Sequence, residues 1–292
     1  MCILCDFKSS AAVRGDGGSH RWSARRGFLK AAAAGAATAA GGAALAQVDV
    51  GKSSSLRKLV PAETLENAAN QQYLQMLQEA SGQKALLPAS DPQVQRLHGI
   101  ARRLIPFTAA WNDRARQWKW QVNLIRSEQI NAFCMPGGKI AFYTGILDQL
   151  RLTDDETAMI MGHEMAHALR EHARERVAKS TATSVGLRLG AALLGLGELG
   201  DVAANLGAQL LTLKFSREDE SEADLVGLEL AARGAFQPRA GVSLWQKMAA
   251  VQQGKGIEFL STHPSGPARI RELEANVPKV QRLYEQAARP PR

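Results

Sequence analysis

Two histidines and a glutamate form the segment of this chain with the clearest capacity for chemistry. His163, Glu164 and His167 make an H-E-x-x-H pattern. Residues four apart on a helix lie on the same face, so both imidazoles can bind one divalent metal ion. Glu164 is turned about 100° from His163, near enough to take a proton from a water at that metal. The pattern predicts a hydrolytic metal site, and two structural histidines on an ordinary helix are the competing interpretation.

An acidic segment downstream offers the third protein ligand that a catalytic zinc requires beside one open position. Residues 216–224 read SREDESEAD, and Glu220 and Asp224 lie four apart on one helix face. One carboxylate can bind the metal while the other accepts the free N–H of a ligand histidine. An acidic helix face exposed to solvent is the alternative. Residue types alone do not choose among Glu218, Asp219, Glu220 and Glu222.

Four motifs occur in a fixed order along the chain: NAFCMPGG, HEMAH, SREDESEADLVG and THPSGPARI. Together they resemble the Ste24/HtpX/Oma1-type zinc metalloendopeptidases (gluzincins), in particular the soluble periplasmic BepA- and LoiP-like branch. The similarity extends over roughly residues 62–276. It implies one Zn²⁺ per chain, held by His163, His167 and Glu220, with Asp224 behind the ligands.

The same resemblance assigns roles to two further segments. It implies that Asn131, Ala132 and Phe133 line an edge strand that pairs with an extended substrate backbone, a mode that confers affinity without demanding one sequence. It also brings His263 and Arg269 near the metal. His263 would stabilise the oxyanion of the transition state, occupy the open metal position in a latent state, or serve only as a helix-entry residue; Arg269 would add positive charge or hold the loop.

The sequence pattern around these motifs predicts an α+β fold, mainly helical and zincin-like, with a small sheet whose edge strand faces the cleft. Thr153 and Glu156 form a capping box that begins a helix through His163 to about Val177. Ser216 begins another, which ends at Gly234. Further helices are expected at 62–80, 91–104, 238–252 and 268–276, and extended segments at 118–126, 131–134 and 139–143.

The N-terminal residues 1–46 have the character of an export signal. A basic stretch with the pair Arg25-Arg26 precedes an uncharged Ala/Gly run that closes with Ala-Leu-Ala. Paired arginines before Phe-Leu-Lys are typical of a twin-arginine signal, so we expect cleavage after Ala46 and a periplasmic location. A disordered basic leader or a weak membrane anchor is the alternative. Residues 47–60 are then a flexible linker, and 61–292 form one peptidase domain.

The composition of the chain limits the classes of partner that we expect. The formal net charge of +8 is shared equally between residues 1–46 and the remainder, which gives little support to nucleic-acid binding. Charged residues interrupt the Gly/Ala/Leu-rich segment 181–213, so a transmembrane span is not expected there, and two buried helices or a lid over the site are favoured. A membrane-embedded relative that uses residues 185–213 is the opposing hypothesis. Cys134 has no histidine and asparagine arranged for a cysteine protease.

The remaining histidines carry less information. His172 follows His167 by five positions, about 140° around a continuous helix, so it should not share the ligand face and is expected to be structural. His98 is expected to be a partly buried helix residue.

The predicted function is zinc-dependent cleavage of misfolded or unassembled envelope proteins in protein quality control. Its partners would be unfolded substrates and the outer-membrane assembly machinery. A metal-bound chaperone that holds outer-membrane protein clients without cutting them is the alternative. The intact Glu164 favours the enzyme.

Overall fold

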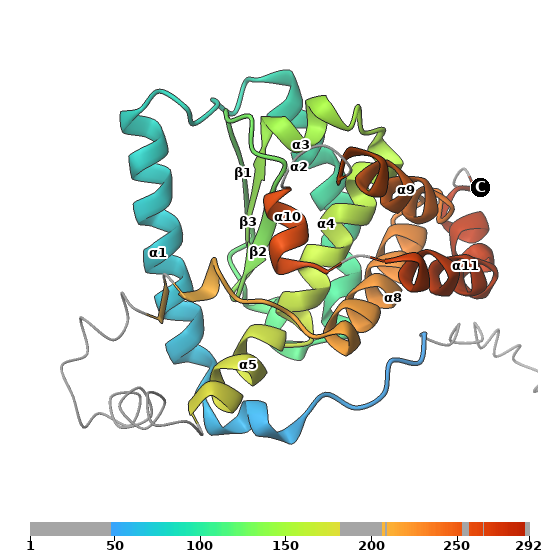
Figure 1. Ribbon diagram of the computed structural model, residues 1–292, viewed down its shortest axis with the longest axis horizontal. Helices are drawn as coiled ribbons and strands as arrows, with labels where there is room; N and C mark the ends of the chain where they lie inside the picture. Colours follow the sequence, from blue (N-terminus) through green and yellow to red (C-terminus); the bar gives the residue numbers. More distant parts are fainter. Residues whose placement is uncertain (1–47, 182–205, 208, 253–256, 265, 290–292) are drawn as a thin grey trace, which may run out of the picture. The chain divides into compact units, whose positions relative to one another are not determined.

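The computed structural model describes residues 48–181, 206–207, 209–252, 257–264 and 266–289. All of them belong to one compact unit, Leu45–Arg292 (Figure 1). The expected signal peptide and most of the segment 181–213 lie outside the described residues, so these two predictions stay predictions.

Three strands form one small sheet. They are β1 (Gln121–Ile125), β2 (Ala132–Met135) and β3 (Lys139–Tyr143), in the order β1-β3-β2. β1 runs parallel to β3, and β2 runs antiparallel to it. The turn between β2 and β3 has positive φ at Gly137 (81°) and Gly138 (74°), a conformation that glycine adopts without a steric penalty.

Helices cover both faces of the sheet (Figure 1). Ala141 and Tyr143 of β3 face α1 (Ala62–Gly82), where Tyr73 is fully buried. Ile140 and Phe142 point the opposite way, into the larger core beneath α2 (Pro92–Leu104) and α4 (Asp154–Leu169). Because side chains alternate along a strand, one sheet can separate two apolar layers. The α+β prediction is therefore confirmed.

Helix α4 carries the H-E-x-x-H motif through the interior. Its capping box forms as expected: Thr153 accepts from the Glu156 amide, and Glu156 accepts from the Thr153 amide. The predicted end near Val177 is wrong, because α4 stops at Leu169. Glu171 has φ +61°, which ends the helical path, and a separate helix, α5 (His172–Thr181), begins directly after it.

Helix α8 (Arg217–Arg233) packs against α4 and bears the acidic motif. Ser216 is its N-cap and Gly234 its C-cap, as predicted, and Asp219 completes a capping box with Ser216. The helices cross at Gly162 and Gly227, where backbone meets backbone. This close crossing brings the acidic side chains of α8 to the histidines of α4.

The remaining elements complete the helical body. They are η1 (Ser55–Leu59), η2 (Ile105–Ala110), η3 (Asp113–Arg116), α3 (Thr144–Gln149), α9 (Ala240–Gln252), α10 (Glu258–Thr262) and α11 (Pro267–Ala287). The short α10 was not predicted. The predicted end of the last helix, near residue 276, is wrong, because Val277, Val280 and Leu283 continue its buried face.

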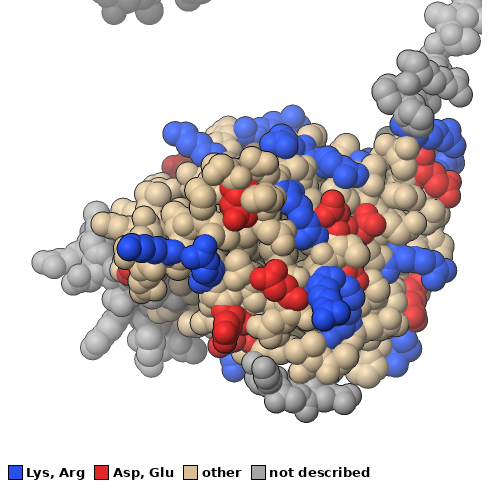
Figure 2. Space-filling view, turned by 90° about the horizontal axis from the view of Figure 1, so that it is seen from above, with Lys and Arg blue, Asp and Glu red and all other residues tan. Residues whose placement is uncertain are grey.

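Residues 47–60, assigned to a linker, make defined contacts. Val48 is buried and its amide donates to Glu229, and Ser55–Leu59 form η1. On the face drawn in Figure 2, basic and acidic side chains are interspersed. Among the described residues, no helix is both long and apolar enough to cross a membrane.

Candidate metal centre

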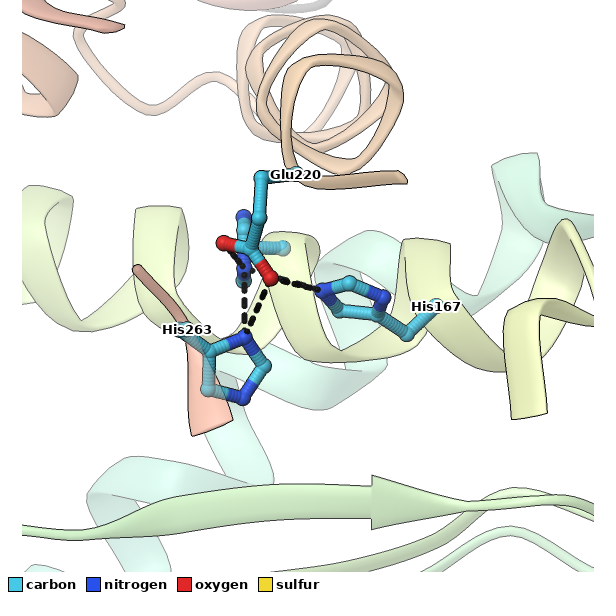
Figure 3. Close-up of side chains that lie close together, drawn as sticks. His167, Glu220 and His263 are labelled. Atoms are coloured by element: carbon cyan, nitrogen blue, oxygen red, sulfur yellow. Dashed lines mark hydrogen bonds and ion pairs between the residues drawn. The ribbon is translucent and has the colours of Figure 1, made fainter. Parts of the chain in front are cut away.

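Four buried side chains from three elements converge on one point (Figure 3). His163 and His167 come from α4, Glu220 from α8, and His263 from the residue after α10. Each offers one nitrogen or oxygen atom, and these atoms all lie within 4.8 Å of one another. The distant carboxylate and the two imidazoles therefore meet, which is the arrangement that a metal site needs.

The distances among these atoms fit a small tetrahedral ion. Ligand atoms about 2.0–2.1 Å from a tetrahedral metal lie roughly 3.3 Å apart. His163 Nε2 lies 3.1 Å from His167 Nε2 and 3.3 Å from His263 Nδ1. Glu220 oxygens lie 3.5 Å from each of the first two nitrogens and 3.0 Å from His263 Nδ1. The donor set thus accommodates a zinc ion.

The partner of His163 fixes the direction of its lone pair. Its Nδ1 lies 3.0 Å from Asp224 Oδ1, and a carboxylate accepts but does not donate. Nδ1 therefore carries the proton, and Nε2 turns its lone pair toward Glu220. An imidazole oriented by a carboxylate in this way is the usual arrangement behind a metal ligand.

Burial and hydrogen bonding set the charges of the donor set. Burial raises the pKa of Glu220, but its close contacts with His167, His263 and His163 outweigh burial and hold the pKa far below its usual range. Burial lowers the pKa of His167 well below its ordinary value. An ionised carboxylate and a neutral imidazole are the forms that bind a metal.

Glu164 lies beside the donor set without belonging to it. Its Oε1 is buried, has no hydrogen-bond partner, and lies 3.4 Å from His263 Nε2. Burial raises the pKa of Glu164 despite the neighbouring histidines, while the backbone amide of Cys134 in β2 lowers it. The carboxylate therefore stands between the metal-ligand candidates and the edge of the sheet, ready to exchange a proton.

Arg269 ties three elements together behind the site. Its Nε and Nη2 donate to the two oxygens of Asp224 at 2.7 and 2.8 Å, and its Nη1 donates to the Pro264 carbonyl in the His263 loop. Nη1 also lies 2.6 Å from Glu220 Oε2, outside hydrogen-bond geometry, so that contact is an ion pair. The guanidinium stacks on Trp245. Arg269 thus holds the loop and both carboxylates.

A cleft of about 130 Å³ opens onto Glu164, His167 and His263. One wall is β2, an edge strand in the sheet of the described residues, with Asn131, Ala132 and Phe133 among its lining. Four apolar residues also line the cleft and are called the apolar wall below: Leu210, Leu211, Leu213 and Phe215. The predicted edge strand at the cleft is present.

The structure brings together every residue singled out from the sequence for this site, and it adds others. Phe215 stacks on the His167 ring at 3.9 Å, and Trp245 Nε1 donates to Asp224.

His172 contacts His167 although it is not among the four clustered donors. The expected geometry of His172 was wrong because α4 ends before it. The alternation of Leu211, Leu213 and Phe215 was the one sequence signal for the apolar wall.

Comparison with known proteins agrees with this geometry. The profile of peptidase family M48 matches residues 91–277, well over half of the chain. The chain belongs to peptidase family M48. Members of this family are metal-dependent peptidases, and the His/Glu cluster lies inside the matched region.

Individual relatives bear related names. Mitochondrial metalloendopeptidase OMA1 of Schizosaccharomyces pombe is 37% identical over 67% of this chain and 56% of its own length. Metalloprotease LoiP of Escherichia coli is 27% identical over 68% of this chain and 76% of its own. The beta-barrel assembly-enhancing protease of Yersinia pestis is 31% identical over 51% of this chain and 32% of its own. The chain therefore spans little more than half of the OMA1 relative.

Proposed function

We propose that this M48 member is a zinc-dependent metalloendopeptidase in which His163, His167 and Glu220 hold one Zn²⁺. The observation that carries the proposal is the donor set: the two imidazole nitrogens lie 3.1 Å apart, and His163 and His167 lie 3.5 Å from Oε2 and Oε1 of Glu220, respectively, close to the ligand spacing of a tetrahedral zinc site. A His/His/Glu set with one further position favours zinc over other first-row metals.

Glu164 is the proposed general base and acid. When bound, the metal supplies a Lewis acid that polarises the scissile carbonyl and makes water more acidic. Glu164 takes a proton from the attacking water and then delivers it to the leaving amine. Its buried Oε1 suits this role, because no hydrogen bond within the protein occupies it.

His263 and Arg269 have supporting roles in this proposal. His263 Nε2 faces Glu164 and its Nδ1 faces Glu220, so the ring lies on the side of the site that opens to the cleft. From there it donates a hydrogen bond to the oxyanion of the transition state. Arg269 contacts Asp224, Glu220 and the His263 loop, and so holds them in fixed positions relative to one another.

The substrate is proposed to bind as an added strand on β2. The Tyr143 amide donates to the Asn131 carbonyl. Because hydrogen-bonded and non-hydrogen-bonded pairs alternate along antiparallel strands, Ala132 and Cys134 turn their backbone groups away from β3. Asn131, Ala132 and Phe133 line the cleft, and the outward carbonyls of Ala132 and Cys134 are the main-chain partners offered to an extended peptide, while the apolar wall offers a place for its side chains. Extended chains with exposed apolar residues are characteristic of unfolded proteins.

The proposed setting is quality control of envelope proteins in the periplasm, with unfolded proteins and the outer-membrane assembly machinery as partners. The twin-arginine-type leader ending at Ala46 supports export, and the name of the Yersinia pestis relative refers to beta-barrel assembly. The OMA1 relatives are named as mitochondrial, so the comparisons alone do not assign a compartment.

The test compares casein cleavage by the mature protein, residues 47–292, with that by Glu164→Gln, with zinc content measured in both. We expect cleavage by the wild type, a loss of about 10²- to 10⁴-fold in the variant, and equal zinc. Equal cleavage by both would refute the role of Glu164. If both proteins bind unfolded casein and neither cleaves it, the chaperone alternative would be favoured. Membership of a peptidase family speaks against that alternative.

A further inference from the structure

A second histidine lies directly behind His167, and the mechanism above gives it no task. His172, the first residue of α5, is 2% exposed. Its Nδ1 lies 2.9 Å from His167 Nδ1, and its Nε2 lies 3.3 Å from Glu222 Oε2. The same Glu222 oxygen accepts from Arg170 Nε at 2.7 Å. The four side chains form a continuous line that ends at a proposed metal ligand.

The direction of every proton in this line follows from its outer end. Glu222 Oε2 forms an ion pair with Arg170 Nε at 2.7 Å, so this carboxylate accepts hydrogen bonds and donates none. His172 Nε2 must therefore donate. The other nitrogen of a neutral imidazole is an acceptor, so His167 Nδ1 donates to His172. His167 Nε2 is left with its lone pair toward Glu220.

The backbone is bent to make this contact. On a continuous helix His172 would lie about 140° away from His167. Glu171 instead takes φ +61°, a conformation that residues with a Cβ rarely adopt. The helical path is interrupted there, and the ring centroids of His167 and His172 lie 5.0 Å apart.

The two histidines of the motif are thus oriented by parallel arrangements from α8. His163 contacts Asp224, which Arg269 holds in turn. His167 contacts His172, which Glu222 holds, and Arg170 holds Glu222. Groups of this kind fix the tautomer and rotation of a ligand imidazole.

We propose that His172, anchored by Glu222 and Arg170, is a positioning residue that holds His167 in the tautomer and orientation required to bind the metal. The proposal rests on the proposed function, because it requires His167 to be a metal ligand. It predicts that breaking the line weakens zinc binding itself, before any effect on catalysis.

The test measures zinc affinity by competition with a chromogenic chelator, using residues 47–292 and variants whose folding is checked by circular dichroism. We expect His172→Phe to bind zinc about 10- to 100-fold more weakly. His172→Asn, whose amide oxygen can replace the Nδ1 acceptor, should recover part of the affinity. A role in packing alone predicts the opposite order, since Phe fills the ring's volume and Asn does not. Wild-type affinity in folded His172→Phe would overturn the proposal.

Three further variants complete the test. If His172→Phe does not fold, Glu222→Ala decides, because this side chain is partly exposed: weaker zinc binding supports the line, and unchanged binding overturns it. Glu220→Gln tests the metal site itself, so undiminished zinc binding there would refute the proposed function rather than this inference. His98→Asn is the matched control, a histidine bonded to the Val122 carbonyl, and should keep wild-type affinity.

The absorption spectrum of the Co²⁺-substituted protein gives a second readout. A change in its visible bands in His172→Phe, with none in His98→Asn, would support altered ligand geometry. Identical spectra in all three proteins would contradict it.

Discussion

Gly162 of α4 and Gly227 of α8 touch through their backbones. A Cβ on Gly227 would lie 2.7 Å from the backbone nitrogen of His163, and a Cβ on Gly162 would lie 2.9 Å from the carbonyl oxygen of Gly227. Real Cβ atoms do not approach other atoms this closely. The absence of side chains at these two positions therefore sets the separation of the helices and, with it, the distance from Glu220 to the histidines.

Gly227→Ala should separate the two helices. We expect the free energy of unfolding to fall by about 1–3 kcal/mol, as for other overpacked sites, and zinc affinity to fall with it. Urea denaturation and chelator competition measure the two effects. Gly82→Ala is the control, since nothing lies within 4 Å of a Cβ there, and it should be neutral or slightly stabilising. A Gly227→Ala protein as stable and as tightly zinc-binding as wild type would contradict the close-crossing argument.

The apolar wall should select substrates. Leu213 lines the cleft while its neighbour Lys214 is exposed. Leu213→Ser should reduce kcat/KM by about ten-fold or more for peptides with a large apolar residue near the cleaved bond, and much less for peptides with a small one. Lys214→Ser should leave both values unchanged. A uniform loss over all peptides would show that Leu213 has no part in specificity.

Acid should destabilise the fold partly through Glu156, far from the metal site. Burial raises the pKa of this carboxyl, but Lys247, the Thr153 amide and Ser243 outweigh it and lower the pKa below 4.5. A depressed folded-state pKa stabilises the protein above the unfolded value and loses that contribution as pH falls through the folded value. Glu156→Gln should therefore be less stable at pH 7 and show a shallower loss of stability below about pH 4.5. If the free energy of unfolding falls with pH in the same way for the wild type and Glu156→Gln, Glu156 does not contribute to acid destabilisation.

Cys134 should be inert. The thiol is 9% exposed, and burial raises its pKa well above the usual value. Iodoacetamide at pH 8 should modify it slowly in the folded protein and rapidly in urea, because the thiolate is the reactive form. Cys134→Ser should retain proteolysis. Loss of cleavage in a folded, zinc-replete Cys134→Ser protein would revive the cysteine-protease alternative.

Local signals predicted the parts of the structure that depend on neighbouring residues. The capping box at Thr153 and the helix start at Ser216 involve contacts within a few positions, and both form. The α+β class follows from the same local patterns. The convergence of Glu220 with the histidines was inferred from resemblance, since no short-range rule relates α4 to α8.

Features that depend on backbone reversal or tertiary packing escaped prediction. The end of α4 is set by the positive φ of Glu171, a residue type with no special preference for that conformation, so the position of His172 was missed. Phe215 reaches His167 because its amide donates to the Thr262 carbonyl, a contact between distant segments. Helix α11 extends because its later residues are buried.

A crystal structure of the zinc-loaded protein, with anomalous scattering measured at the zinc edge, tests the central claim most directly. The account predicts one strong peak per chain, about 2.0–2.2 Å from His163 Nε2, His167 Nε2 and a carboxylate oxygen of Glu220. A zinc ion bound elsewhere, or a site in which Glu220 lies outside ligand distance, would contradict it.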